Sequence, residues 1–157
     1  MIRISPFGIS SICISSTGDA VGRHIGGAVS DTLATEKYMI ENSPAIPIDS
    51  DILIAPHHGA DNGSSMAFIN AVSPTWVVFS AGHRFGHPCD VTVDRYLAAG
   101  IPATRMLRTD RGDGEGEPAR GCEEWDPNGN FPAHDPVGDD DVEIVIWSDG
   151  TFIARYR

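Results

Sequence analysis

The chain has 157 residues, 41% of them hydrophobic and 21% charged, and 11 basic against 22 acidic side chains give a formal net charge of -11. These values are typical of one ordinary domain over residues 1–157, and they exclude collagen-like, disulfide-framework and fully disordered chains. No stretch approaches the roughly 20 apolar residues of a membrane-spanning helix, and the first residues lack the pattern of a secretory signal. We therefore expect a soluble, cytoplasmic domain that does not bind membranes.

In chain order, apolar and β-branched runs alternate with helical patterns. The first run, 9–16, predicts a strand, and a helix should follow from Ser30 or Asp31 to about residue 42 with Leu33, Tyr38 and Ile40 facing inward. The next strand and helix are expected at 51–55 and, after an N-cap at Ser64 or Ser65, to about residue 72. They are followed by a strand at 76–79, a helix capped by Asp90 that ends at Gly100, and a weaker strand at 103–107.

The last part of the chain predicts a β-hairpin. Two runs at 142–147 and 151–156 flank Ser148-Asp149-Gly150, and Asp-Gly favours a tight turn between antiparallel strands. Together with the preceding alternation, the order predicts an α/β fold in which helices cover one face of a mixed sheet.

Between the last helix-strand unit and this hairpin lies most of the negative charge. Residues 110–141 contain eleven acidic residues and two arginines, whereas the other 125 residues have a net charge of only -2. Glycine and proline are also frequent there, so we expect a long surface loop. Asp139, Asp140 and Asp141 are candidates for metal binding, but a solvated run of like charges is the simpler interpretation. The loop would repel phosphate backbones and no basic patch compensates, so a nucleic-acid partner is not expected.

The cysteines give a hint about the compartment. Cys13, Cys89 and Cys122 are far apart in the sequence and form no C-x-x-C pair. An odd number of cysteines without an export signal predicts reduced thiols and agrees with a cytoplasmic location.

Side chains that can bind metals follow three of the expected strands. Asp19 comes after the first strand, His57 and His58 after the second, and His83 and His87 after the third. In an α/β sheet, ligands bind beyond the carboxyl ends of the strands, and a carboxylate with several histidines suits Zn²⁺ or a similar divalent ion. Taken singly, each has a plainer interpretation as a turn, loop or supporting residue.

Four motifs resemble those of the metallo-β-lactamase-fold hydrolases, in the branch related to the hydrolase domain of a competence DNA-uptake protein. Asp51-Ile-Leu-Ile-Ala-Pro-His-His-Gly-Ala60 is similar to the D-x-L-x-x-P-H-H-G signature of this branch. Three further segments resemble its T-G-D, S-x-G-…-Y-G-H-P and R-T-D-…-G motifs, namely 17–19, 80–88 with Phe85 in the aromatic position, and 108–112. The resemblance covers about residues 9–112 and the final hairpin.

The resemblance implies a two-metal hydrolase site that holds Zn²⁺ or, as a second choice, Mn²⁺. Asp19 matches the carboxylate that bridges the metals, and His58 is placed on a metal. His57 would face the charged oxygen of the substrate, and His87 would line the pocket and orient the substrate. The reaction would be the attack of metal-bound hydroxide on an ester, phosphoester or amide bond of a small-molecule or phosphoester substrate.

The sequence departs from this family in one large respect. It has no H-x-H-x-D-H motif, which supplies most of the metal ligands, and His24 follows Arg23 where the motif would have its aspartate. The chain therefore resembles only the C-terminal half of the two-part sandwich, and we expect it to be inactive when isolated. A second chain with the N-terminal half, or a homodimer, would complete the site. The alternative is a non-catalytic, truncated remnant or protein-binding module that pairs with another chain.

Overall fold

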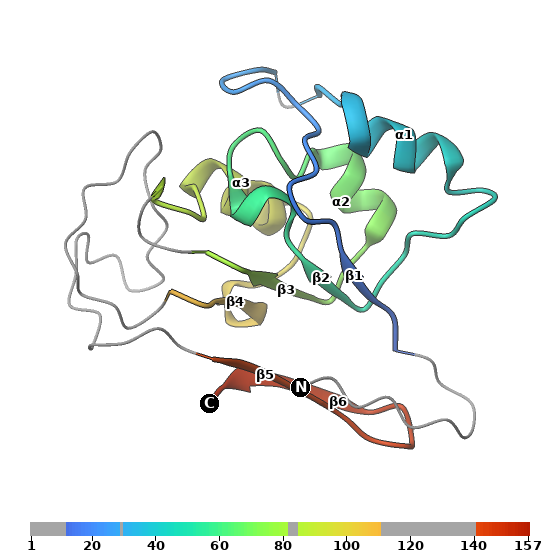
Figure 1. The fold of residues 1–157 in the computed structure, drawn as a ribbon, viewed down its shortest axis with the longest axis vertical. Helices are drawn as coiled ribbons and strands as arrows, with labels where there is room; N and C mark the ends of the chain where they lie inside the picture. The colour runs from blue at the N-terminus through green and yellow to red at the C-terminus, as the bar shows by residue number, and fades with distance from the viewer. Residues whose placement is uncertain (1–11, 29, 82–84, 111–140) are drawn as a thin grey trace.

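The computed structural model describes residues 12–28, 30–81, 85–110 and 141–157. At its centre is a parallel sheet whose strands lie side by side in chain order, β1 (Ile14–Ser16), β2 (Ile52–Ile54), β3 (Trp76–Phe79) and β4 (Met106–Arg108). The helices α1 (Ala34–Asn42), α2 (Met66–Val72) and α3 (Asp90–Ala98) lie on one face of this sheet (Figure 1). The expected alternation of strands and helices is confirmed.

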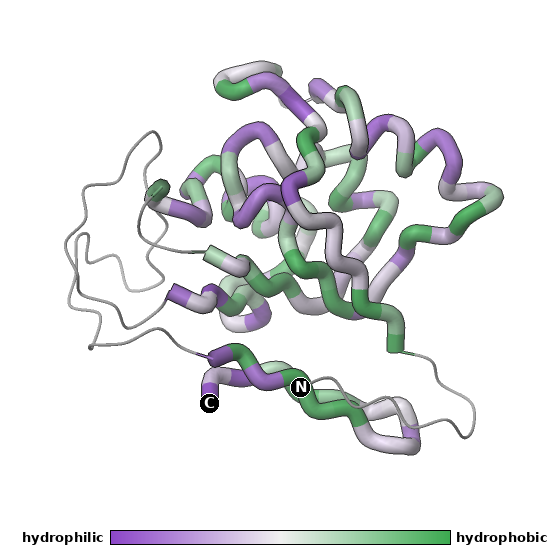
Figure 2. The backbone as a smooth tube through the Cα atoms, in the orientation of Figure 1, coloured by the Kyte–Doolittle hydropathy of each residue, from purple (hydrophilic) through white to green (hydrophobic). Residues whose placement is uncertain are grey.

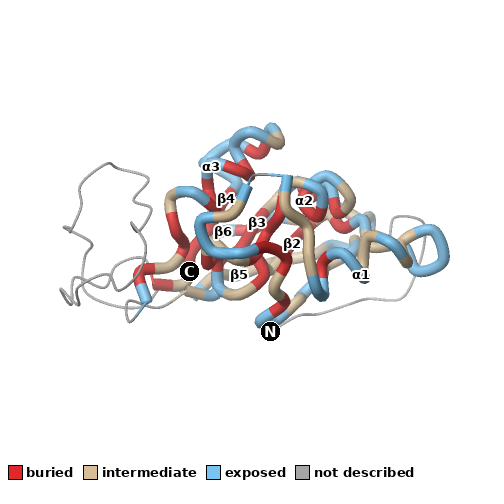
Figure 3. The backbone as a smooth tube through the Cα atoms, turned by 90° about the horizontal axis from the view of Figure 1, so that it is seen from above, coloured by how far each residue is buried: buried red, intermediate tan, exposed pale blue. Residues whose placement is uncertain are grey.

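The C-terminal hairpin is also confirmed, but it does not join the sheet. Its strands β5 (Val142–Ile146) and β6 (Phe152–Tyr156) pair antiparallel with each other and lie on the face opposite the helices (Figure 1). Seen from above, the hairpin overlaps the sheet (Figure 3). The backbone N–H of Arg108, on the outer edge of β4, donates to the hydroxyl of Tyr156 at 3.0 Å. The expectation of one mixed sheet is therefore wrong, because a side chain and not a strand backbone meets this edge.

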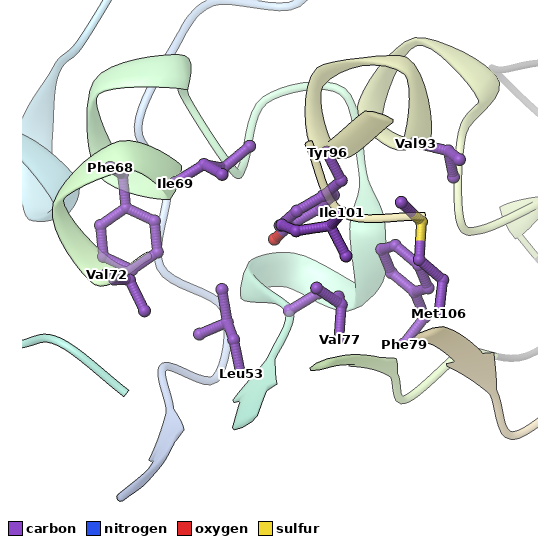
Figure 4. Close-up of a cluster of buried hydrophobic side chains, with 11 residues drawn as sticks. Leu53, Phe68, Ile69, Val72, Val77, Phe79, Val93, Tyr96, Ile101 and Met106 are labelled. Atoms are coloured by element: carbon purple, nitrogen blue, oxygen red, sulfur yellow. The ribbon is translucent and has the colours of Figure 1, made fainter. Parts of the chain in front are cut away.

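The main core lies between the sheet and the helices. Tyr96 of α3 packs edge-on against Phe79 of β3, with ring centroids 5.7 Å apart, and both side chains are fully buried. Figure 4 shows these rings among the other core side chains. The buried cluster contains Leu53, Ala55, Phe68, Ile69, Val72, Val77, Phe79, Val93, Tyr96, Ile101 and Met106.

The second face of the sheet is covered as well. Ile52 and Leu53 are adjacent in β2, so their side chains point to opposite faces, and both are fully buried. Apolar residues run along the sheet strands and along much of the hairpin (Figure 2), and Ala154 of β6 is buried. The continuous apolar run at 51–55 therefore reflects a strand between two layers.

The helix boundaries show where tertiary contacts override local signals. Ser65 caps α2 as expected, because its Oγ accepts the N–H of Phe68. By contrast, α1 begins at Ala34 and not at Ser30 or Asp31, since Leu33 is extended and its N–H is bonded to the carbonyl of Gly22.

Other local expectations also needed correction. Tyr38 is exposed, and the buried residue of α1 is Glu36. Asp90 is the first residue of α3 and Cys89 is its N-cap, while the helix ends at Ala98 before Gly100. Part of the expected fourth strand, Ala103–Arg105, is a short 3-10 helix.

The expectations drawn from composition have mixed outcomes. Cys13 is a free thiol, but Cys89 is disulfide-bonded. The expectation that all three cysteines are reduced is therefore wrong, because separation along the sequence does not determine separation in space. Among the described residues, none of the helices has the length and apolar character needed to cross a bilayer. The expected acidic loop lies outside the described residues except for its two ends, Asp110 and Asp141.

Candidate functional site

The turns that follow β1, β2 and β3 bring four of the expected site residues together. Oδ1 of Asp19 lies 3.1 Å from Nε2 of His58. The ring of His57 lies 6.3 Å, between centroids, from the rings of both His58 and His87. His83 lies outside the described residues. The described site is therefore one carboxylate and three imidazoles at the carboxyl end of the sheet.

The Pro56–Gly59 segment, a 3-10 turn, presents the two adjacent histidines in an uncommon backbone conformation. His57 (φ 48°, ψ 43°) and His58 (φ 58°, ψ 13°) are both left-handed, a conformation that costs energy for residues with a Cβ atom and that recurs at functional sites. The N–H of His57 donates to the carbonyl of Gly18 at 2.8 Å, and its own carbonyl accepts the N–H of Ala60. The Thr-Gly-Asp turn thus holds the His-His turn directly through the backbone.

The contacts of His58 define which of its nitrogens faces Asp19. Nδ1 of His58 lies 2.6 Å from the carbonyl oxygen of Ser80, which can only accept a hydrogen bond, so Nδ1 carries a proton. In the neutral ring, Nε2 then has a lone pair, and it faces an oxygen of the Asp19 carboxylate. A proton or a metal ion shared by these two atoms would make the contact attractive.

Asp19 and His58 have side chains of the kinds that bind divalent ions. An imidazole nitrogen and a carboxylate oxygen are both ligands of Zn²⁺ at about 2.0–2.2 Å, and both side chains are accessible, with exposed fractions of 48% for His58 and 75% for Asp19. Within the described part of the chain, no group of three or more His, Cys, Asp or Glu side chains could hold an ion. An ion bound by this pair would therefore need further ligands.

The ring of His57 is held by a residue that the sequence reasoning missed. Nδ1 of His57 lies 2.7 Å from Oδ1 of Asn62. Asn62 belongs to the loop between the His-His turn and α2, five positions after His57. Apart from this proximity, nothing in the sequence marks it as a partner of His57.

The third histidine, His87, has a pKa below the ordinary value of a histidine. Burial lowers the pKa of His87, the electrostatic interaction with His57 and His58 lowers it further, and these effects outweigh a backbone hydrogen bond at Gly86 and the charge of Asp110. The ring stacks on Phe85, with centroids 6.0 Å apart. His87 is therefore kept neutral beside an exposed aromatic ring.

A buried ionic cluster lies next to the His-His turn and was also missed. Asp61 Oδ1 accepts from Arg23 at 2.8 Å and from Arg95 at 3.0 Å, and Oδ2 accepts from the N–H of Gly26. Burial opposes ionisation of Asp61, but these bonds and charges prevail and its pKa is lowered. Arg23 is thus a structural residue, whereas His24 beside it is exposed.

The Arg-Thr-Asp motif also has a structural role in the described chain. Arg108 and Asp110 form a two-pronged ion pair at 2.6 and 2.7 Å, and both are buried. Thr109 donates its N–H to Phe79 and its hydroxyl to the carbonyl of Ala81. The motif therefore ties the end of β4 to the end of β3, next to the histidines.

Comparison with known proteins gives one partial similarity. A stretch of 63 residues, 39% of this chain, is 41% identical to the competence protein ComA of Neisseria gonorrhoeae. Over this stretch the chain is ComA-like. The chain spans only 9% of the length of that protein. No family model matches the chain, and no solved structure matches it.

Proposed function

We propose that the chain supplies part of the metal site of a metallo-β-lactamase-type, metal-dependent hydrolase, as the C-terminal half of the two-part sandwich. The observation that carries this proposal is the 3.1 Å approach of Asp19 Oδ1 to Nε2 of His58, while Ser80 occupies the opposite nitrogen of the ring. Proteins usually orient a metal-binding histidine through a hydrogen bond from the ring nitrogen that does not face the metal.

The four residues have distinct proposed roles. Asp19 and His58 would hold a divalent ion, with Zn²⁺ first because of the mixed nitrogen and oxygen ligands and Mn²⁺ second. Such an ion, when bound, polarises a substrate oxygen and lowers the pKa of water. His57 and His87 would contact the substrate and orient the bond that is cleaved.

The net charge of the chain bears on the substrate class that we propose. We propose an ester, amide or small phosphoester, because a net charge of -11 disfavours a long nucleic-acid backbone. The remaining ligands would come from residues outside the described ranges, from a second chain that supplies the N-terminal half, or from a second copy of this chain.

Metal binding is the first test. Titration calorimetry with Zn²⁺ and with Mn²⁺ is carried out on the unmodified chain, Asp19→Ala, His58→Ala and the matched control His24→Ala, which removes an exposed loop histidine. We expect weak binding of one ion that Asp19→Ala and His58→Ala each abolish and His24→Ala leaves intact. Equal binding by all four proteins would refute the site.

Turnover separates the hydrolase from the alternative binding module. Hydrolysis of bis(p-nitrophenyl) phosphate and p-nitrophenyl acetate is measured at saturating metal. Turnover that requires Asp19 and His58 supports the hydrolase. Metal binding without turnover on either substrate, once a chain with the N-terminal half is also present, favours a non-catalytic module.

A further inference from the structure

The side chain of Asn62 contacts His57, and its backbone has a separate role. Within the described residues, the side chain of Asn62 makes one hydrogen bond, between its Oδ1 and Nδ1 of His57. Its backbone carbonyl accepts the N–H groups of Gly22 and Arg23 at 2.9 and 3.1 Å. A substitution at this position therefore removes the contact to His57 and leaves the backbone bonds of the loop in place.

The neighbouring ionic cluster holds Asn62 in position. Asp61 precedes it and is bonded to both Arg23 and Arg95, and Arg95 also donates to the carbonyls of Asp61 and Gly63 on either side of Asn62. Because both flanks of Asn62 are fixed by buried guanidinium groups, its amide is presented to His57 in a defined position.

The backbone of His57 is held by hydrogen bonds at its N–H and at its carbonyl. The contact with Asn62 instead concerns which ring nitrogen carries the proton. An amide oxygen only accepts hydrogen bonds, so Oδ1 of Asn62 at 2.7 Å places that proton on Nδ1. Nε2 then keeps its lone pair. In water, neutral histidine prefers the opposite arrangement, with the proton on Nε2, so the contact would reverse the intrinsic preference.

We infer that Asn62 is a positioning residue that holds His57 as the Nδ1–H tautomer, with Nε2 as a proton acceptor. This inference rests on the proposed function for its use, and it changes one role expected from the family resemblance. A neutral ring with an unprotonated Nε2 cannot donate a hydrogen bond to a charged substrate oxygen. It accepts a proton instead, from attacking water or from a protonated substrate group.

The test is ¹⁵N NMR of labelled histidines in the metal-free chain, at a pH well above about 6.5, the ordinary pKa of histidine. His57→Gln assigns the signals. In the unmodified chain we expect the proton of His57 on Nδ1. Asn62→Ala moves it to Nε2 in most molecules, and Asn62→Asp, which keeps an acceptor, restores it to Nδ1. Asn42→Ala is the matched control, because within the described residues the Asn42 side chain bonds only to its own helix, at the carbonyl of Tyr38.

Two results would overturn the inference. One is a proton on Nε2 of His57 in the unmodified chain, and the other is an unchanged tautomer in Asn62→Ala with an unchanged unfolding midpoint. The readout needs neither metal nor turnover, so it is separate from the test of the proposed function. If the chain does not bind zinc but the tautomer of His57 depends on Asn62, the metal site alone is refuted. If the chain binds zinc at Asp19 and His58 but the tautomer does not depend on Asn62, the positioning role alone is refuted.

Discussion

Gly59 lies directly against Pro88, so that a Cβ atom placed on Gly59 would be 2.6 Å from Cβ of Pro88 and 2.7 Å from the ring of Phe79. The carbonyl of Gly59 also accepts the N–H of Cys89 at 3.0 Å. The turn that carries His57 and the segment that carries His87 are therefore in contact through a position where a side chain does not fit.

The first prediction is that Gly59→Ala destabilises the chain and separates these two segments. The left-handed backbone (φ +86°) and the two overlaps together cost about 2–4 kcal/mol of unfolding free energy. Urea unfolding measures this loss. Gly100→Ala is the matched control, because its φ is +92° and no atom lies within 4 Å of the added Cβ, so it should cost only about 1 kcal/mol. Equal losses in both variants would contradict the contact.

The second prediction concerns the acid sensitivity of His87 in the metal-free chain. Burial and the neighbouring histidines lower the pKa of His87 in the folded chain. As the pH falls, the unfolded chain therefore binds a proton at this residue at a higher pH than the folded chain does. Stability should therefore fall as the pH drops below about 6.5, and His87→Gln should remove this part of the pH dependence. NMR titration should show His87 protonating below the ordinary range, and His57→Ala should raise its pKa. If the titration midpoint of His87 were the same in His57→Ala as in the unmodified chain, the result would argue against electrostatic coupling between these two histidines.

The third prediction is that Asp61 stabilises the fold through its charge. Asp61→Asn leaves the buried guanidinium groups of Arg23 and Arg95 without their carboxylate, and the expected cost is about 3–5 kcal/mol near neutral pH. Since the pKa of Asp61 is lowered, its contribution is present above the unfolded pKa and disappears as the pH falls through the folded one. The stability gap between Asp61→Asn and the unmodified chain should thus narrow in acid. Asp94→Asn, an exposed position on α3, should change little.

The fourth prediction is that Tyr156 fastens the hairpin to the sheet. Tyr156→Phe removes the acceptor of the Arg108 N–H, which should cost about 0.5–1.5 kcal/mol and speed hydrogen exchange at the Arg108 amide. Tyr38→Phe, at an exposed ring, is the control for loss of a hydroxyl. Unchanged exchange at Arg108 would mean that other contacts hold β6 against β4.

Much of the fold was predictable because its signals are local. The runs Ile52–Ile54 and Trp76–Phe79 have the apolar, β-branched character of buried strands, and Ser65 is a good N-cap whose bond stays within its own helix. The separate layer formed by β5 and β6 was not predictable. Strand pairing within a hairpin depends on the turn, whereas joining a sheet depends on the edge that the hairpin meets.

The candidate site divides in the same way. Asp19, His57, His58 and His87 were identifiable because they follow strands at one end of a sheet and lie in recognisable motifs. Their partners were not, since Ser80 acts through a backbone carbonyl and Asn62 through an ordinary loop amide. Every residue has a carbonyl, so its identity does not mark it as the partner of a histidine.

The sequence by itself determined the order of the elements, the apolar strands and the residue types that can bind a metal, because each depends on neighbours a few positions away. Only the tertiary structure decided that Glu36 turns inward to accept the N–H groups of Ser64 and Ser65, and that Asp61 joins two buried arginines. Burial of a charge is favourable only when donors or opposite charges meet it. For Glu36 and Asp61, these partners belong to segments far apart along the chain.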